Sequence, residues 1–152
     1  ATSSLFNLNL PKISLPFLIS ATDDTVPAIH PNTATSQRDV GSTILDWLGG
    51  YAPWFTGQSL LNEHYAGQSS FSDGSLFFWV DGKRMVTIDS SNNSLQQCFH
   101  IKDDTIKLKR ADCNESWVAP LFEQGRDFNA LTQELLFNGE TTQYRDIFSQ
   151  TH

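Results

Sequence analysis

Apolar residues between Ser36 and Gly50 recur at helical spacing. Four of them fall at i, i+4, i+7 and i+8, which is the stripe of an amphipathic helix. Ser36 can serve as the N-cap, with Asp39 three residues on as its partner in the positive first turn. Gly49-Gly50 supplies a left-handed stop. The pattern predicts a helix whose apolar stripe is buried; the stripe consists of Val40, Ile44, Trp47 and Leu48.

The pattern then changes to the period of strands. Residues 76–80 and 84–88 flank Asp81-Gly82, a strong hairpin turn signal. A second turn, 90–93, leads to residues 95–101 and 105–109, which flank Lys102-Asp103-Asp104 as a second hairpin. Because residues 105–109 alternate strictly, we expect one face of this sheet to contact solvent.

The remaining segments are less regular. Residues 13–19 form a short apolar run around Pro16, typical of a buried or edge strand. Residues 21–35 and 51–70 are loop-like. Residues 127–137 predict a second helix, which Asn138-Gly139 ends. Its apolar stripe consists of Phe128, Leu131, Leu135 and Leu136.

These elements predict a single α+β domain over residues 1–152. Residues 1–70 form a strand–helix–loop part, and residues 71–137 form an antiparallel meander with a helix. Residues 138–152 are expected to be a frayed tail. A four-stranded antiparallel sheet with the C-terminal helix across it would bury the apolar face.

The chain is acidic, with a formal net charge of -7 over 152 residues. Binding to nucleic acid or to an anionic membrane needs clustered Lys and Arg, so this balance argues against both. The densest basic group, residues 102–110, fits a solvated strand face. No apolar window is long enough to span a membrane. The first four residues lack the basic segment of a signal peptide, which indicates a mature, cut or subcloned chain.

Cys98 and Cys113 are the only cysteines. They are too few and too far apart for a zinc cluster of the CxxC type. A disulfide between them would close a loop worth about 3 kcal/mol in chain entropy. The residues by themselves leave this bridge open, and export to an oxidising compartment would favour it.

Residues that could carry chemistry are scattered. His30, His64, His100 and His152 are unpaired in sequence, and each fits a surface or packing role better than a ligand role. Two acidic pairs, at 23–24 and 103–104, sit in turns, where Asp bonds its own backbone. An aromatic cluster lies around the end of the first helix and fits core packing, or else a lip that contacts sugar or lipid. Its members are Trp47, Tyr51, Trp54 and Phe55.

Several segments between Lys12 and Leu136 together resemble the sulfatase and alkaline-phosphatase-like hydrolases. Residues 15–19 look like the x-P-L-[IL]-[IV] strand of that superfamily, and residues 77–88 look like its late strands. Residues 36–49 look like its S-x-x-D-[IVL]-x-x-T-[IL]-L-D-x-x-G helix, with Asp39, Thr43, Leu45 and Asp46 in register. Residues 57–60 look like G-x-S-L. Two positions depart from the pattern: Arg38, where Val or His is common, and Gly41, where Pro or a hydrophobe is usual.

The resemblance implies the C-terminal portion of a metal-dependent hydrolase or transferase with an α/β/α alkaline-phosphatase-like fold. Lipoteichoic-acid-synthase-like phosphoglycerol or phosphoethanolamine transferases are the favoured relatives. In such enzymes a divalent metal (Mn, Mg, Zn or Ca) assists a nucleophile. Their nucleophile and Asp-His metal pair precede the x-P-L-[IL]-[IV] strand, and this chain contains no Asp-His dipeptide. We therefore assign no catalytic or metal-binding residue and expect the chain alone to be inactive.

Further expectations follow from the resemblance. His30 would border the substrate cleft, and the main partner would be the remainder of the catalytic domain upstream. The protein would be extracytoplasmic and anchored in the membrane by a segment absent here, so Cys98 and Cys113 would be bridged. The alternative is a non-enzymatic α+β module that binds a protein or a glycan through residues 51–55.

Overall fold

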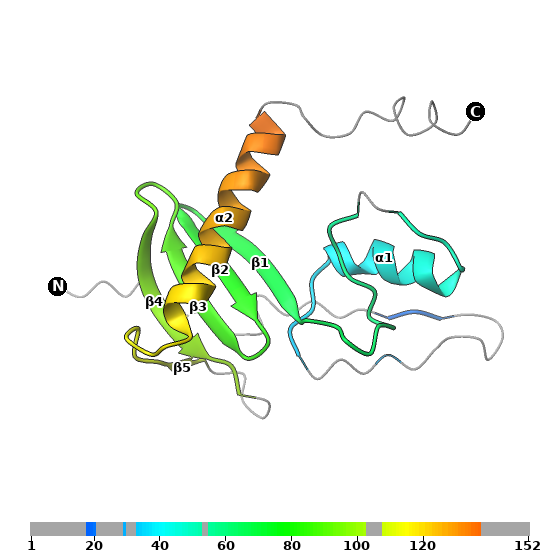
Figure 1. Cartoon of the computed structure of the whole chain (residues 1–152), viewed down its shortest axis with the longest axis horizontal. Helices are drawn as coiled ribbons and strands as arrows, with labels where there is room; N and C mark the ends of the chain where they lie inside the picture. The colour runs from blue at the N-terminus through cyan, green and yellow to red at the C-terminus, as the bar shows by residue number, and fades with distance from the viewer. Residues whose placement is uncertain (1–17, 21–28, 30–32, 53–54, 103–107, 138–152) are drawn as a thin grey trace.

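The computed structural model describes residues 18–20, 29, 33–52, 55–102 and 108–137. Within these ranges the strands form one antiparallel meander in the order β1-β2-β3-β4-β5, flanked by two helices (Figure 1). The α+β class predicted from the sequence is confirmed, with five strands where four were expected. The elements are α1 Arg38–Trp47, β1 Gln68–Asp73, β2 Leu76–Asp81, β3 Arg84–Asp89, β4 Ser94–His100, β5 Lys109–Arg110 and α2 Val118–Phe137.

The central hairpins lie where the turn signals predict them. β2 pairs with β3 from Leu76↔Asp89 to Asp81↔Arg84, and Gly82 takes a φ of 58° in the turn between them. β3 pairs with β4 across the turn at residues 90–93, with an irregularity in register between Thr87 and Ile88. Glycine adopts a positive φ without steric cost, which is why the turn forms at this position.

The edge strands were only partly anticipated. β1 begins in the stretch of residues 51–70, which is rich in glycine and aromatic residues and was interpreted as a loop. Pairing with β2 along its whole length, from Gln68↔Asp81 to Asp73↔Leu76, makes it a strand. Phe71 is its one large apolar side chain and stacks on Phe78 at 4.4 Å between ring centroids. At the other edge, β5 pairs with the end of β4.

Both faces of the central strands are buried. Towards α2, the core contains Phe77, Trp79 and Ile88. On the opposite face, Phe78 and Met85 are fully buried. The expectation of a solvent-facing side is therefore wrong for β2 and β3. Their sequences are nearly continuous apolar runs, as strands covered on both faces require, and the alternation at residues 105–109 does not extend to them.

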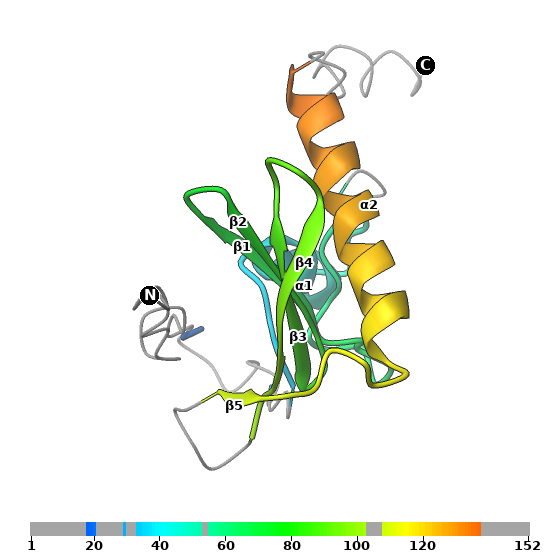
Figure 2. The same cartoon turned by 90° about the vertical axis from the view of Figure 1, so that its left-hand side faces the viewer.

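Helix α2 begins nine residues before its predicted start at residue 127. Pro120 is compatible with this start because the N–H groups of the first turn have no intrahelical acceptor. Gly125 faces the sheet, and a Cβ there would lie 2.7 Å from Cβ of Trp79. Gly125 thus allows α2 to lie close along one face of the sheet (Figure 2). Of the predicted stripe, Phe128 packs against the core, whereas Leu131 is 56% exposed.

Helix α1 lies beside the sheet rather than on the face that α2 covers (Figure 1). Asp39 is in its first turn, as predicted, and its carboxylate accepts the Ser36 N–H at 2.8 Å. The N-cap is Gln37, one residue later than predicted. The predicted burial of the apolar stripe is wrong: Ile44 is 40% and Leu48 73% exposed, while Val40 and Trp47 are half-buried. The helix instead buries its polar face.

The structure contains a disulfide between Cys98 and Cys113, with a Cα separation of 5.5 Å. β5 runs antiparallel to β4, and the Ala111 N–H donates to the Cys98 carbonyl at 2.8 Å. This pairing turns the chain back so that Cys113, two residues later, reaches β4. The bridge therefore fastens the segment that leads into α2 to the sheet.

Several predictions fall outside the described residues. These are His30, His152, Trp54, both acidic pairs, the tail from residue 138 and residues 105–107 of the fourth predicted strand. Of the strand predicted at residues 13–19, the structure describes only Leu18 and Ile19, and neither is in a strand.

Candidate functional site

The polar face of α1 is hydrogen-bonded to the loop that follows the helix. The Thr43 hydroxyl donates to the Asp39 carbonyl at 2.7 Å and accepts the Leu60 N–H at 3.0 Å. The Ser42 hydroxyl donates to the Gly57 carbonyl at 2.9 Å. These bonds hold the loop, residues 56–60, against the helix, and they explain why Thr43 is fully buried.

The Asp39 carboxylate organises the start of α1 and is only 2% exposed. One oxygen accepts the Ser36 N–H at 2.8 Å and the Tyr65 hydroxyl at 2.6 Å. The other oxygen accepts the Gln58 N–H at 2.9 Å. A buried carboxylate needs such donors because an unpaired buried charge is costly. Asp39 therefore joins the backbone at Ser36 and Gln58 to the side chain of Tyr65.

Gly57 is the point of closest approach between the loop and α1. A Cβ at this position would overlap the Arg38 carbonyl oxygen and lie 2.8 Å from the Asp39 nitrogen. Only glycine fits there, because both obstacles are backbone atoms that cannot rotate away. The G-x-S-L segment thus begins with a glycine that the contact requires.

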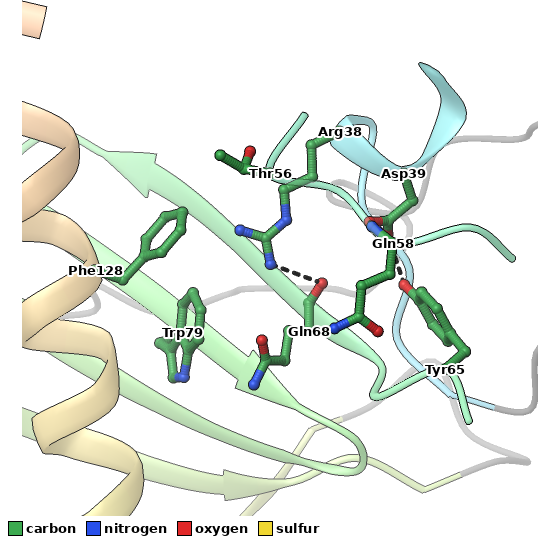
Figure 3. A pocket seen from close by; sticks show the side chains of 8 residues that line it. All are labelled: Arg38, Asp39, Thr56, Gln58, Tyr65, Gln68, Trp79 and Phe128. Atoms are coloured by element: carbon green, nitrogen blue, oxygen red, sulfur yellow. Dashed lines mark hydrogen bonds between the residues drawn. The ribbon is translucent and has the colours of Figure 1, made fainter. Parts of the chain in front are cut away.

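A cleft of about 240 Å³ opens between this α1–loop unit and the layer formed by the sheet and α2 (Figure 3). It receives side chains from the first turn of α1, from the loop after it, from β1 and β2, and from α2. Polar groups and the Tyr65 ring lie on the α1 side, and the rings of Trp79 and Phe128 lie on the side of the sheet and α2 (Figure 3). The lining residues are Arg38, Asp39, Thr56, Gln58, Tyr65, Gln68, Trp79 and Phe128.

Arg38 extends across the cleft from α1 towards the aromatic wall (Figure 3). Its guanidinium carbon lies 4.9 Å from the ring centroid of Phe128 and 5.8 Å from that of Trp79, within cation–π range. One terminal nitrogen donates to the Gln68 carbonyl at 3.4 Å. The Nε atom is buried and has no hydrogen-bond partner. The position of the Arg38 guanidinium is thus set mainly by contact with the faces of two aromatic rings. Within the described residues, one of its N–H groups donates a hydrogen bond.

Tyr65 closes the Asp39 side of the cleft. Burial raises the pKa of its hydroxyl far above the usual value, and the hydrogen bond to the Asp39 carboxylate adds to this rise. The hydroxyl therefore stays neutral and acts as a donor at physiological pH. It does not have the lowered pKa of a general base.

The histidines that the structure describes lie outside this cleft. His64 is exposed. His100 lies 3.3 Å from the Glu115 carboxylate, and its ring is tilted against that of Trp117 at 5.3 Å between ring centroids. The Trp117 indole N–H, with His100, holds the pKa of Glu115 below its usual value. His30, predicted to border a substrate cleft, is outside the described residues.

The described residues offer no metal site, since no three His, Cys, Asp or Glu side chains among them are grouped to hold an ion. They do not supply the donor set that a metal-dependent enzyme of the resembled superfamily needs, so no chemical step is assigned to a metal here. No helix in the described ranges is long and apolar enough to cross a membrane.

The sequence did not single out the cleft because its lining comes from positions 38 to 128. Two lining residues gave a usable signal: Arg38 departs from the helix pattern of the resembled superfamily, and Asp39 matches it. Phe128 was predicted to lie in the apolar stripe of the second helix, and Trp79 falls within a predicted strand; both pack in the core beside α2. Comparisons with protein-family models, with curated proteins and with solved structures find no significant match to this chain.

Proposed function

We propose that this chain is the C-terminal portion of a sulfatase-like, metal-dependent hydrolase or transferase that acts on phosphate or sulfate esters. Phosphoglycerol or phosphoethanolamine transfer is the favoured reaction. The observation that carries the proposal is the contact between the two resembling segments. Asp39 and Thr43 of the helix motif accept hydrogen bonds from Gln58 and Leu60 of the G-x-S-L segment. Residues that define the resemblance thus share one structural role.

In this proposal the chain supplies scaffold and cleft, and residues upstream supply the nucleophile and the metal ligands. The exposed apolar side of α1 supports a missing neighbour. Ile44 in α1, Leu48 at its C-cap and Tyr51 shortly after it are 40%, 73% and 85% exposed, while the polar face of the helix is buried. Apolar groups gathered in this way commonly mark an interface.

An extracytoplasmic location belongs to the same proposal. The Cys98–Cys113 disulfide supports it, because such bridges persist in oxidising compartments. The membrane anchor would lie in a segment that this chain does not include.

The alternative is a non-enzymatic module that binds a protein or a glycan through residues 51–55. The observation that favours it is the exposure of aromatic rings after α1, with Tyr51 at 85% and Phe55 at 42%. Exposed tyrosines are common anchors at binding surfaces.

The native gene product separates the two proposals. An antibody raised against this chain would capture it, and its mass, bound metals and hydrolysis of p-nitrophenyl phosphate and sulfate would be measured. The enzyme proposal expects a product much larger than 17.0 kDa, with stoichiometric divalent metal and ester hydrolysis that a chelator abolishes. The isolated chain is the matched control and should hydrolyse neither ester.

A native product that carries no metal and hydrolyses neither ester would overturn the enzyme proposal. The module proposal would then be tested with Tyr51→Ser, which should abolish capture of the partner, while Tyr51→Phe should retain it. Equal capture by both variants would refute binding through this segment.

A further inference from the structure

Two asparagines in exposed turns stand in the pattern Asn-x-Ser, whose asparagine amide can accept an N-linked glycan when x is not proline. The first is Asn92, in the turn between β3 and β4, and the second is Asn114, in the turn before α2. Both residues are exposed. A glycan is bulky and hydrated and therefore needs a surface position, which both asparagines provide.

The hydrogen bonds of the two side-chain amides differ. Oδ1 of Asn92 accepts the backbone N–H of Ser94 at 3.0 Å, as in an Asx turn, and its Nδ2 group makes no hydrogen bond among the described residues. In contrast, Nδ2 of Asn114 donates to the Asp112 carboxylate at 2.9 Å. The backbone N–H of Asn114 donates to the same oxygen at 3.0 Å. The nitrogen that would carry the glycan is therefore accessible in Asn92 and held in Asn114.

The turn that carries Asn92 is the tip of the β3–β4 hairpin (Figure 2). Asn93 has a φ of 54°, in the left-handed region that asparagine enters more readily than most residues. The Ser94 hydroxyl, which completes the pattern, accepts the Gln96 side-chain amide at 2.6 Å and keeps its own O–H as a donor. A glycan on Asn92 would thus extend into solvent without displacing a strand or a buried side chain.

We propose that Asn92 is a site of N-linked glycosylation. The sugar donor is a lipid-linked oligosaccharide pyrophosphate. Nδ2 of Asn92 forms a bond to the anomeric carbon of the donor, and the bond from this carbon to the pyrophosphate oxygen breaks. The pyrophosphate leaves with the bonding electron pair, and Nδ2 gives up one of its two protons. Such transfer belongs to secreted proteins, and the Cys98–Cys113 disulfide favours the same oxidising compartment.

This inference rests on the extracytoplasmic location in the proposed function, but not on the proposed enzyme activity or its metal. The disulfide reports that location independently of the glycan. One digest of the native product can therefore measure both, and the failure of one can be told from the failure of the other.

The native product is captured with the antibody, digested without reductant and treated with peptide-N-glycosidase in heavy-oxygen water. This treatment converts a glycosylated asparagine into an aspartate that carries heavy oxygen, and a digest without the glycosidase is the control. Mass spectrometry should find the label at Asn92 and not at Asn114, with Cys98 and Cys113 in one linked peptide.

A linked peptide with unlabelled Asn92 would overturn the proposal and leave the location intact. Free thiols with unlabelled Asn92 would overturn both. A label at Asn114 alone would also overturn the proposal. Labels at both asparagines would support Asn92 and show that the bond to Asp112 does not block transfer.

Variants of the native gene test the role of the hydroxyl. Ser94→Ala should abolish the label at Asn92, whereas Ser94→Thr keeps a hydroxyl at this position and should retain it. Ser91→Ala, in the same turn but outside the pattern, is the matched control and should also retain the label. Retention of the label in Ser94→Ala would overturn the proposal. If this variant fails to fold, the label at Asn92 in the wild type still decides the question.

Discussion

At the scale of single residues, Asp39 has the largest structural role. A buried polar residue is tolerated only where its hydrogen bonds are complete, and each oxygen of this carboxylate has a donor. The partners come from the residues before α1, from the loop after it and from Tyr65. The start of α1 therefore depends on one side chain.

Asp39→Asn should destabilise the fold by about 1–3 kcal/mol. The asparagine amide places an N–H₂ group where one oxygen accepted, so the backbone N–H of Ser36 or of Gln58 loses its acceptor. Urea unfolding measures the loss. Asp46→Asn, on the exposed side of the same helix, should change stability by less than about 0.5 kcal/mol. Equal effects of the two variants would contradict the assigned role of Asp39.

Tyr65 gives the fold a dependence on alkaline pH. Its pKa is raised in the folded protein, chiefly by burial, above the value of about 10 that it has when unfolded. Below pH ~10 the Tyr65 hydroxyl is protonated in both the folded and the unfolded protein, and its full contribution to the free energy of unfolding is present. Above pH ~10 the hydroxyl ionises in the unfolded protein but not in the folded one, so the free energy of unfolding falls as pH rises.

Unfolding at a series of pH values above neutrality should therefore show a steeper loss of stability for the wild type than for Tyr65→Phe. Tyr51→Phe, at a ring that is 85% exposed, should keep the wild-type slope. A wild-type slope in Tyr65→Phe would contradict the assignment.

At the scale of elements, α2 shows how packing can override a local preference. Glycine within a helix usually costs stability relative to alanine. At Gly125 the helix lies so close to the sheet that a Cβ would be 2.7 Å from Trp79 Cβ and 3.1 Å from Ile88 Cδ1. In the same helix, Val118 and Leu121 are buried against the sheet.

Gly125→Ala should therefore destabilise the protein by about 1–3 kcal/mol, despite the better helix propensity of alanine. The sheet must shift to admit the methyl group, since Cβ of Trp79 cannot rotate away. Gln124→Ala, on the exposed side of α2, is the control and should be neutral or slightly stabilising. Thermal unfolding compares the two, and a rise in melting temperature for Gly125→Ala would show that the contact is loose.

At the scale of the whole molecule, the disulfide and α2 hold the meander together. Cys98 is fully buried in β4, and Cys113 precedes α2 by a few residues. The bridge spans a sequence separation of 15. The bridge keeps the segment between β5 and α2 close to β4, also before α2 has packed on the sheet during folding.

The double variant Cys98→Ala/Cys113→Ala should lose ~3 kcal/mol of stability, the loop-closure value for a loop of this length. Urea midpoints of the oxidised wild type and the variant give the difference, and reductant should bring the two close together. A difference below about 1 kcal/mol would indicate that α2 packing already constrains the segment in the unfolded ensemble.

Much of the secondary structure was determined locally by the sequence. Glycine and asparagine turns around Gly82 and at residues 90–93 define the hairpins, because few other residues take a positive φ. Helix α1 and the position of Asp39 in its first turn follow from periodicity and from the preference of the first turn for acids. The α+β class followed from these elements.

The tertiary structure alone decided which surfaces meet. The sequence predicted that the apolar stripe with Ile44 and Leu48 is buried, but both side chains are exposed. The opposite face, with Asp39 and Thr43, is buried instead, because the loop at residues 57–60 donates hydrogen bonds to both side chains. The serine-rich β1 became a strand through pairing with β2. The cleft at Arg38 needs residues that are 90 positions apart, between Arg38 and Phe128, to meet. A sequence pattern records the local period of a chain, whereas burial and sites depend on contacts between distant segments, which no local period encodes.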